Sequence, residues 1–438
     1  MRTAESQVYA DPELAKIAWL SSQNSAQVYH SLMHHINAAS LRSCFEKLDG
    51  QKAIGVDKIS KEIYGSNLKS NIEDLLTRMK RMAYRPGIIR QVLIPKEGKP
   101  GATRPLGISN FEDKIVQKRV QEILDSIYEP IFSERSYGFR PRRGCHDAIK
   151  ALKDYLYEEE VETVIDVDLA NFFGTIDHQI LMEMLKIKIK DTKFLRYISR
   201  MCKAGVLAEG ELIVSEEGVA QGSCCSPALS NVVAHYVIDM WIEDTVKPLT
   251  TGKIEMFRYA DDLIICCRYE RDAIKVKTAL AKRLAKYKLK LNEDKTKLVS
   301  FSKNKSRQGI KQEKFDFLGF TFYLGRSRAG RVIPKLKTNG KRFRSKLKRV
   351  NEWARSNRNK WPLRQLWKTF CAKIRGHVQY YGVSFNTEMV SKFVHAAKCI
   401  MFKWLNRRSQ RTSMDWEKFD RFRLKFPLPE VKVYHKLF

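Results

Sequence analysis

Four aspartates stand in segments that otherwise read as buried strands. Asp166 and Asp168 end an apolar run over residues 161–169, and Asp261 and Asp262 interrupt a second apolar run. A buried carboxylate is costly unless it is paired or bound to a metal ion. Mg²⁺ prefers oxygen ligands and usually takes one or two carboxylates together with substrate phosphates. The residue types therefore indicate a magnesium site, and two such ions about 3.5–4 Å apart serve in-line phosphoryl displacement.

The spacing alone leaves two questions open. An Asp-Asp pair also suits a simple hairpin turn, and residues 254–268 predict two short strands around Ala260-Asp261-Asp262. Asp166 and Asp168 lie two residues apart on the same face of a strand, so either could be a ligand. A carboxylate from each of two adjacent strands would suit the two-ion geometry.

The rest of the pattern predicts mixed helices and strands. Residues 1–90 have mainly helical spacing, residues 88–110 look extended, and the chain from 340 onward is helical and basic. Helices are also predicted over 112–128, 178–190, 226–244 and 270–289, with strands over 161–169 and 296–301. The fold class is therefore α+β with a separate helical C-terminal part.

Charge is distributed unevenly along the 438 residues. Residues 301–438 hold 35 basic and 8 acidic side chains, a net +27, whereas residues 1–300 hold 46 and 41, a net +5. Such a field attracts phosphate backbones and makes binding sensitive to salt. A basic disordered tail is the alternative, but the tryptophans and tyrosines that recur over 353–404 are unlike such tails.

The densest basic segment is Lys341–Arg349, with six basic residues in nine. Phe343, Leu347 and Val350 recur at helical spacing, so one face of this helix would pack and the rest would face phosphates. The alternative for this segment is a charged face that only water covers.

The cysteines and the hydropathy of the sequence limit the cellular compartments and partners that are expected. The nine cysteines form no C-x-x-C pattern, so no zinc finger can be drawn and reduced thiols in a cytoplasmic protein are expected. No apolar run approaches the roughly 20 residues of a membrane span, so no membrane partner is expected.

Seven sequence blocks resemble one enzyme family in their order and spacing. Tyr259-Ala260-Asp261-Asp262 resembles the Tyr-x-Asp-Asp signature of reverse transcriptases, and Asp168 with Phe173 five residues later resembles their first catalytic block. The other blocks that resemble this family, and its group II intron subfamily in particular, are 94–108, 136–141, 221–227, 291–297 and 317–320. The resemblance runs from about residue 30 to the C-terminus.

The resemblance implies a right-hand polymerase that copies an RNA template with deoxynucleotides and two Mg²⁺ ions. Asp168, Asp261 and Asp262 would be the catalytic metal ligands, with the Leu169 carbonyl as a further ligand. Asp168 is preferred to Asp166 because the ring of Phe173 then falls where it would exclude a 2′-hydroxyl. The other implied nucleotide contacts are Lys96, Arg104, Gln221, Gly222 and Lys295, and Leu318 with Gly319 would grip the primer.

Three parts follow from the same resemblance. Residues 1–90 would form an N-terminal extension and the start of the fingers, 91–325 the fingers and palm, and 326–438 a basic helical thumb or maturase domain. The side chains expected to bind RNA are Lys341, Arg342, Arg344, Lys346, Lys348, Arg349, Arg375, Arg407 and Arg408. Partners would be template RNA, intron RNA, a DNA or RNA primer and dNTP, for a monomer or a dimer.

The sequence departs from the family pattern in places. Gly174 stands where relatives often carry Asp, and Cys224-Cys225 where they carry Pro-Leu, which puts the shape of the nucleotide pocket in doubt. Only a short tail follows Trp416, so a compact form without an endonuclease is expected.

Two alternatives remain beside the intron maturase. One is a reverse transcriptase of a defence, diversity-generating or CRISPR-linked system. The other is a splicing scaffold that binds RNA without catalysis.

Overall fold

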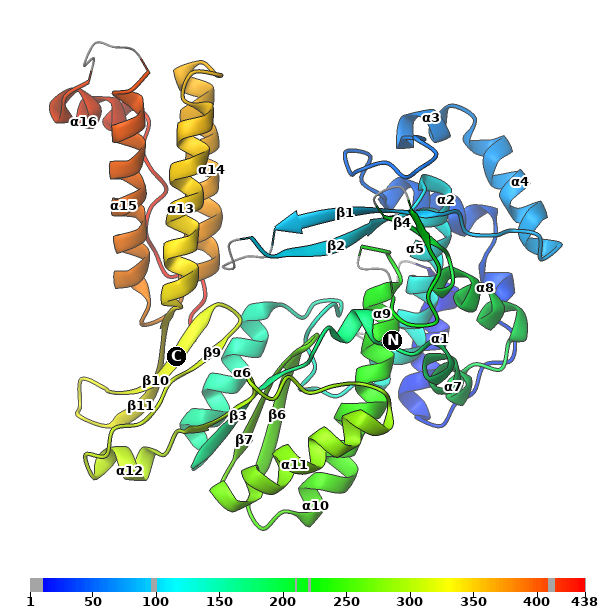
Figure 1. The fold of residues 1–438 in the computed structure, drawn as a ribbon, viewed down its shortest axis with the longest axis horizontal. Coiled ribbons are helices and arrows are strands. Elements are labelled where there is room, and N and C mark those ends of the chain that lie inside the picture. The colour runs from blue at the N-terminus through cyan, green and yellow to red at the C-terminus, as the bar shows by residue number, and fades with distance from the viewer. Residues whose placement is uncertain (1–10, 96–100, 209–210, 220–221, 409–413, 438) are drawn as a thin grey trace. The chain divides into compact units, whose positions relative to one another are not determined.

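The computed structural model describes residues 11–95, 101–208, 211–219, 222–408 and 414–437 (Figure 1). They form two compact units. The first takes described residues within 11–95, 101–148 and 165–298, and the second those within 149–164 and 299–437. The predicted three-part division at residues 90 and 325 is a different partition and stays a prediction.

The N-terminal part of the first unit is helical, as predicted. Its helices are α1 (Pro12–Gln23), α2 (Ala38–Lys47), α3 (Lys61–Ser66), α4 (Leu68–Lys80) and α5 (Phe111–Tyr128). Side chains cap several of them: Asp11 accepts from the backbone of Glu13, and Asn37 and Ser40 form a capping box. Helix α5 is buried on most of its surface and forms the centre of this layer.

A four-stranded sheet adjoins these helices in the order β2-β1-β4-β5. Its strands are β1 (Ile89–Pro95), β2 (Thr103–Ile108), β4 (Val206–Ala208) and β5 (Glu211–Ile213). Strands β1 and β2 form the hairpin that the extended segment 88–110 predicted. Sequence patterns did not predict β4 and β5, because three residues are too few to show alternation.

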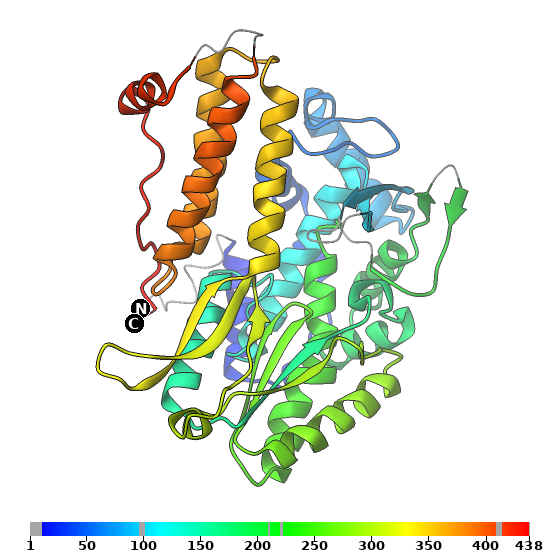
Figure 2. The same cartoon turned by 60° about the vertical axis from the view of Figure 1, so that its left-hand side comes forward.

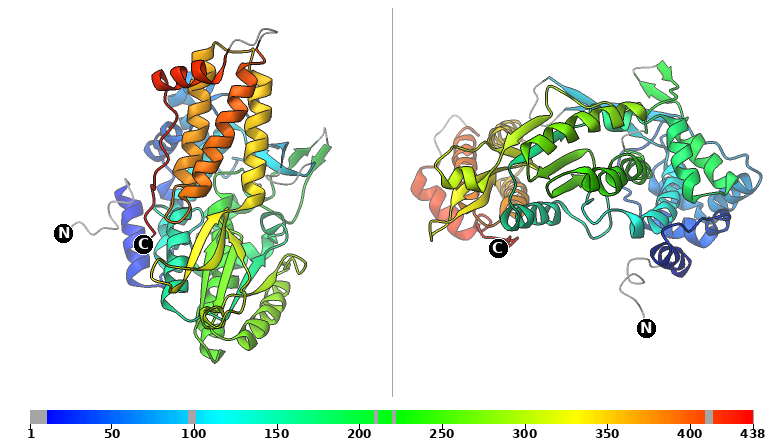
Figure 3. Two further views of the ribbon diagram at one scale, coloured as in Figure 1. Left: turned by 90° about the vertical axis from the view of Figure 1, so that its left-hand side faces the viewer. Right: turned by 90° about the horizontal axis from the view of Figure 1, so that it is seen from below.

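A second four-stranded sheet has the order β6-β7-β3-β8 and is called the central sheet here. Its strands are β3 (Thr163–Asp168), β6 (Ile254–Tyr259), β7 (Asp262–Cys267) and β8 (Lys297–Ser300). Every residue of β7 after Asp262 is buried, as expected of a strand covered on both faces. Helix α11 (Glu270–Lys286) runs beside this sheet (Figure 3).

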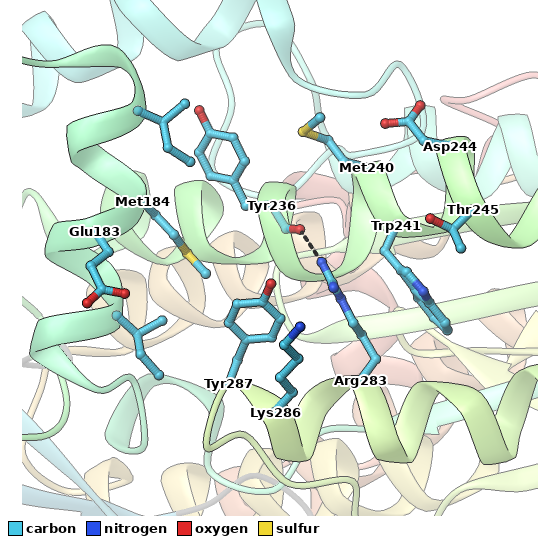
Figure 4. A pocket seen from close by; sticks show the side chains of 12 residues that line it. Glu183, Met184, Tyr236, Met240, Trp241, Asp244, Thr245, Arg283, Lys286 and Tyr287 are labelled. Carbon is cyan, nitrogen blue, oxygen red and sulfur yellow. Dashed lines mark hydrogen bonds between the residues drawn. The ribbon is translucent and has the colours of Figure 1, made fainter.

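The predicted helix over 226–244 is interrupted. Helix α9 (Ser226–Ala234) continues as two π-helical segments, η5 (His235–Asp239) and η6 (Ile242–Val246). Arg283 of α11 donates to the carbonyl oxygens of Tyr236 and Val237, each at 3.1 Å, which stabilises the wider turn of η5 (Figure 4). The hollow beside this contact holds about 600 Å³ and contains none of the predicted site residues.

Three further helices are α6 (Cys145–Glu158), α7 (His178–Lys188) and α8 (Thr192–Cys202). The predicted helix at 178–190 is α7, and α8 was not predicted. Short elements of this part of the chain are α10 (Lys247–Leu249) and η4 (Phe172–Gly174).

The second unit contains a three-stranded antiparallel sheet followed by helices. The strands are β9 (Phe315–Phe317), β10 (Phe320–Arg326) and β11 (Val332–Thr338), and α12 (Lys303–Arg307) precedes them. Helices α13 (Gly340–Asn357), α14 (Leu363–Tyr381) and α15 (Thr387–Leu405) lie side by side (Figure 2), and α16 (Trp416–Lys425) follows.

The basic C-terminal third is folded rather than a disordered tail. Phe370, Ile374 and Val378 of α14 are fully buried. The side chain of Asn386 accepts from the backbone of Thr338 at 2.8 Å and donates to the carbonyl of Tyr381 at 2.8 Å, which joins the strands to the helices. Among the described residues, no helix combines the length and the apolar composition that a membrane crossing requires.

Candidate active site

The central sheet brings the two pairs of aspartates to neighbouring strands. Strand β3 ends at Asp168, β7 begins at Asp262, and β3 and β7 are adjacent in the sheet. Burial raises the pKa of Asp261, the Asp168 carboxylate raises it further, and Arg104 on β2 lowers it. Asp168, Asp261 and Arg104 therefore lie within electrostatic reach of one another.

The turn Asn292–Thr296 fixes the end of β3. The backbone of Asn292 donates to the Asp168 carbonyl at 2.8 Å, and the Asp168 backbone donates to the Thr296 hydroxyl at 3.2 Å. Lys295 Nζ then donates to Asp168 Oδ1 at 3.0 Å. Lys295 thus forms an ion pair with the Asp168 carboxylate. The Lys295 side chain is 48% exposed and that of Asp168 is 40% exposed.

The donor set suits a hard divalent cation in its chemistry. Two carboxylates that repel each other are stabilised by a cation between them, and oxygen is the ligand that Mg²⁺ prefers. No group of three or more His, Cys, Asp or Glu in the described part of the chain is arranged to hold an ion. A complete ligand set with Asp262 therefore stays a prediction, as does the choice of Asp168 over Asp166.

The turn between β6 and β7 is a tight one. Tyr259 pairs with Asp262, which leaves Ala260 and Asp261 as the loop, and Ala260 has a left-handed φ of 57°. A non-glycine residue in this region is strained, so surrounding contacts must hold it. Gly138 supplies one of them: a Cβ at this position would lie 2.2 Å from the Ala260 nitrogen.

A buried arginine also contacts the turn between β6 and β7. Arg258 on β6 is fully buried, and its guanidinium donates to Asp239 at 2.7 and 2.6 Å and to the Ala260 carbonyl at 3.2 Å. It also donates to Asn231 Oδ1 at 3.0 Å, and the amide nitrogen of Asn231 donates to the Gly138 carbonyl at 2.8 Å. Residues of α9, η5 and β6 are thus joined to the carboxylate turn.

Sequence reasoning missed this network. The one available signal was Arg258 inside an apolar run, since a buried arginine needs a carboxylate partner. Its partner Asp239 could not be chosen from the sequence, because the π-helical turn of η5 sets which side chain points toward β6.

The predicted nucleotide contacts lie on several elements of the first unit. Phe173 is half-buried in η4, and its ring meets that of Phe139 edge-on at 6.2 Å. Gly222 has a φ of 110°, and a Cβ there would lie 2.4 Å from the Gly107 carbonyl, so this position accepts only glycine. Lys96 and Gln221 lie outside the described residues.

The predicted primer-grip residues form the turn between β9 and β10 in the second unit. Leu318 and Gly319 have left-handed φ values of 47° and 85°. The Leu318 carbonyl accepts from the Tyr380 hydroxyl at 2.7 Å, and the Gly319 carbonyl accepts from the Asn339 backbone at 3.0 Å. The turn is therefore held by the start of α13 and by α14.

The predicted RNA-binding cations lie on and after the helices of the second unit. Lys346 is half-buried, 4.7 Å from the ring centroid of Tyr381, and Arg408 donates to the Trp361 carbonyl at 3.2 Å. The other members of the predicted set are exposed: Lys341, Arg342, Arg344, Lys348, Arg349, Arg375 and Arg407.

Comparison with known proteins decides the family. The family model described as reverse transcriptase (RNA-dependent DNA polymerase) matches residues 94–322, just over half of the chain. The chain belongs to the reverse transcriptase family. The matched segment contains the central sheet, the carboxylate turn and the turn that carries Leu318, so the predicted polymerase fold is confirmed.

Several relatives of this reverse transcriptase carry intron names. It is 28% identical over 313 residues to the protein YkfC of Escherichia coli, covering 65% of this chain and 79% of that protein. It is 31% identical over 223 residues to the group II intron-encoded protein LtrA of Lactococcus lactis, covering 51% of this chain and 37% of LtrA. A putative COX1/OXI3 intron 2 protein of Saccharomyces cerevisiae is 37% identical over 145 residues, which cover 33% of this chain and 16% of that protein. The predicted resemblance to group II intron reverse transcriptases is thereby confirmed.

Proposed function

We propose that this reverse transcriptase extends a DNA or RNA primer on an RNA template, using dNTPs at Asp168, Asp261 and Asp262. The observation that carries the proposal is the adjacency, in the central sheet, of β3, which ends at Asp168, and β7, which begins at Asp262. The effect of the Asp168 charge on the pKa of Asp261 agrees with this arrangement. Two Mg²⁺ ions bound to these carboxylates and to the Leu169 carbonyl would supply an activated primer hydroxyl and a stabilised leaving oxygen.

We assign the remaining roles, in binding the triphosphate, the pyrophosphate and the sugar, to the surrounding residues. Arg104 is near enough to Asp261 to act on its charge and is proposed, with Lys96, to bind the triphosphate. Lys295, which bonds to Asp168, is proposed to shift to the departing pyrophosphate once cations occupy the carboxylates. Phe173 is proposed to exclude the 2′-hydroxyl.

Contacts to the strands of template and primer complete the proposed machinery. Gln221 and Gly222 would lie along the nascent base pair, and Leu318 with Gly319 would hold the primer end. The close approach of Gly222 to the Gly107 carbonyl supports a backbone contact at this position, because no side chain intervenes.

We further propose a maturase role, in which the exposed cations of α13, α14 and the segment after α15 bind intron RNA. The names of the relatives favour this over a defence, diversity-generating or CRISPR-linked system. The nine free thiols support a reducing, cytoplasmic setting. The retained carboxylates favour an active polymerase over a scaffold without catalysis.

Primer extension tests the proposal. The purified chain should extend a DNA primer on an RNA template with dNTPs only when Mg²⁺ is present. Extension that is absent across templates, primers and metal concentrations, while RNA binding persists, would favour the scaffold instead.

A further inference from the structure

The far end of the helical bundle contains a cleft in which Arg407 alone belongs to the predicted RNA-binding set. It holds about 820 Å³ and is formed by the last turns of α13 and α15 and the residues that follow them. Its lining consists of four cations, two amides and one indole: Asn351, Arg355, Arg358, Lys403, Trp404, Asn406 and Arg407. Among the residues that the structure describes, no carboxylate lines it. The whole cleft belongs to the second unit.

The cations are arranged around a single buried ring. Trp404 is only 7% exposed, and its indole nitrogen donates to Asn351 Oδ1 at 2.8 Å, which ties α15 to α13. Arg358 lies 5.0 Å from the ring centroid, Arg407 5.4 Å and Lys403 5.5 Å. Cation–π attraction therefore holds positive charge at the cleft.

Helix electrostatics explains only part of this cluster. Arg355 and Lys403 stand in the last turns of their helices, where a cation offsets the negative end of the macrodipole. Arg358 and Arg407 lie beyond the helix ends. Within the described chain none of the four makes an ion pair, and nearby Glu352 pairs with Lys348 instead, at 3.9 Å. Four unpaired cations repel one another, and a polyanion would relieve that repulsion.

We propose that this cleft binds the phosphate backbone of structured RNA. The buried indole offers no face for a base to stack on, so the contact is to phosphates and is independent of base identity. With its oxygen taken by the indole, the amide of Asn351 keeps its nitrogen as a further donor. The inference rests on the proposed role in binding intron RNA and adds a surface to it.

The cleft is separate from the proposed primer grip. The grip turn bonds to Asn339, directly before α13, whereas the cleft stands at the other end of that helix. At about 1.5 Å per residue, a helix of 18 residues separates the two by about 27 Å. A short template–primer held at the grip therefore does not require the cleft, and a folded RNA can use both.

The test compares two removals of charge of equal size in the full chain. Arg355→Gln/Arg358→Gln removes two cleft cations, and Arg421→Gln/Arg423→Gln removes two from α16, where each is paired with an acid. Affinity for a group II intron transcript is measured across salt concentrations. The cleft variant should lose at least about tenfold in affinity, and its salt slope should fall by about two, whereas the control should change little.

A graded variant and a second substrate complete the experiment. Exposed Lys403→Gln should lower the slope by about one, without disturbing α13, and thermal unfolding checks that each variant is folded. Unchanged slopes in both cleft variants would overturn the proposal. Equal loss of affinity for a short template–primer would assign the cleft to that duplex instead, which also contradicts it. Failure of the wild-type chain to extend primers would contradict the proposed polymerase activity. The comparison of RNA affinities between the variants would still be valid.

Discussion

Arg258 and Asp239 form a bidentate ion pair, at 2.7 and 2.6 Å, next to the turn that carries Asp261. Both side chains are almost completely buried. The third contact of the arginine is the carbonyl of Ala260, the strained residue of that turn. The pair therefore links the π-helical segment η5 to the position of Asp261. A buried pair does not by itself add stability, but removing one partner leaves a buried charge uncompensated.

Breaking this pair should be strongly destabilising. Asp239→Asn and Arg258→Met should each lower the free energy of unfolding by about 3–5 kcal/mol, because each leaves an unpaired buried group. Denaturant unfolding at neutral pH measures this. A loss below about 1 kcal/mol for both would mean that the pair is not buried as described.

Gly138 should tolerate no side chain. Gly138→Ala places a Cβ 2.2 Å from the Ala260 nitrogen, so the carboxylate turn must move and primer extension should fall by at least about tenfold. Gly376→Ala is the matched control, since nothing lies within 4 Å of a Cβ there. In the interior of α14 it should stabilise by up to about 1 kcal/mol. Equal activity of the two variants would refute the contact.

Lys295 should matter for catalysis rather than for folding. Its ion pair with Asp168 is about half exposed, so Lys295→Gln should change the unfolding free energy by less than about 1 kcal/mol. Primer extension should nevertheless fall by at least about tenfold. Lys297→Gln, an exposed neighbour on β8, is the control. An unaltered turnover in Lys295→Gln would place this lysine outside the reaction.

His377 should make stability depend on pH. Burial, together with the nearby charge of Lys346, lowers the pKa of His377 to about 3, so the folded chain holds the ring neutral. The unfolded chain takes up the proton below its ordinary pKa of about 6.5, so stability present above that pH is lost progressively as pH falls toward 3. Between pH 7 and pH 5 the loss should be about 2 kcal/mol. His377→Phe should remove that part of the dependence, and an unchanged pH profile would contradict it.

Periodicity predicted the long elements, because each has a face that must be buried. Helices α5, α7 and α11 and strands β3, β6 and β7 lie where the apolar pattern placed them. The break into η5 and η6 was not predictable, since apolar spacing alone does not distinguish a π turn from an α turn and Arg283 stabilises it from another helix.

In the candidate site, too, some residues could be predicted from the sequence and others could not. The chemistry of the residues singled out Asp261 and left Asp166 and Asp168 as alternatives, and the family resemblance selected Asp168, whose charge acts on Asp261. Arg258 and Gly138, which position them, were missed because their roles depend on contacts with η5 and with the Ala260 turn. In the basic C-terminal third, Tyr381 and Trp404 are core residues, with exposures of 0% and 7%.

The most direct test of the account replaces the carboxylates without removing their volume. Asp168→Asn, Asp261→Asn and Asp262→Asn should each reduce Mg²⁺-dependent cDNA synthesis by at least about a thousandfold while leaving RNA affinity within about twofold. Exposed Asp244→Asn serves as the control. Synthesis at wild-type rates by any one of the three variants would show that its carboxylate holds no catalytic ion.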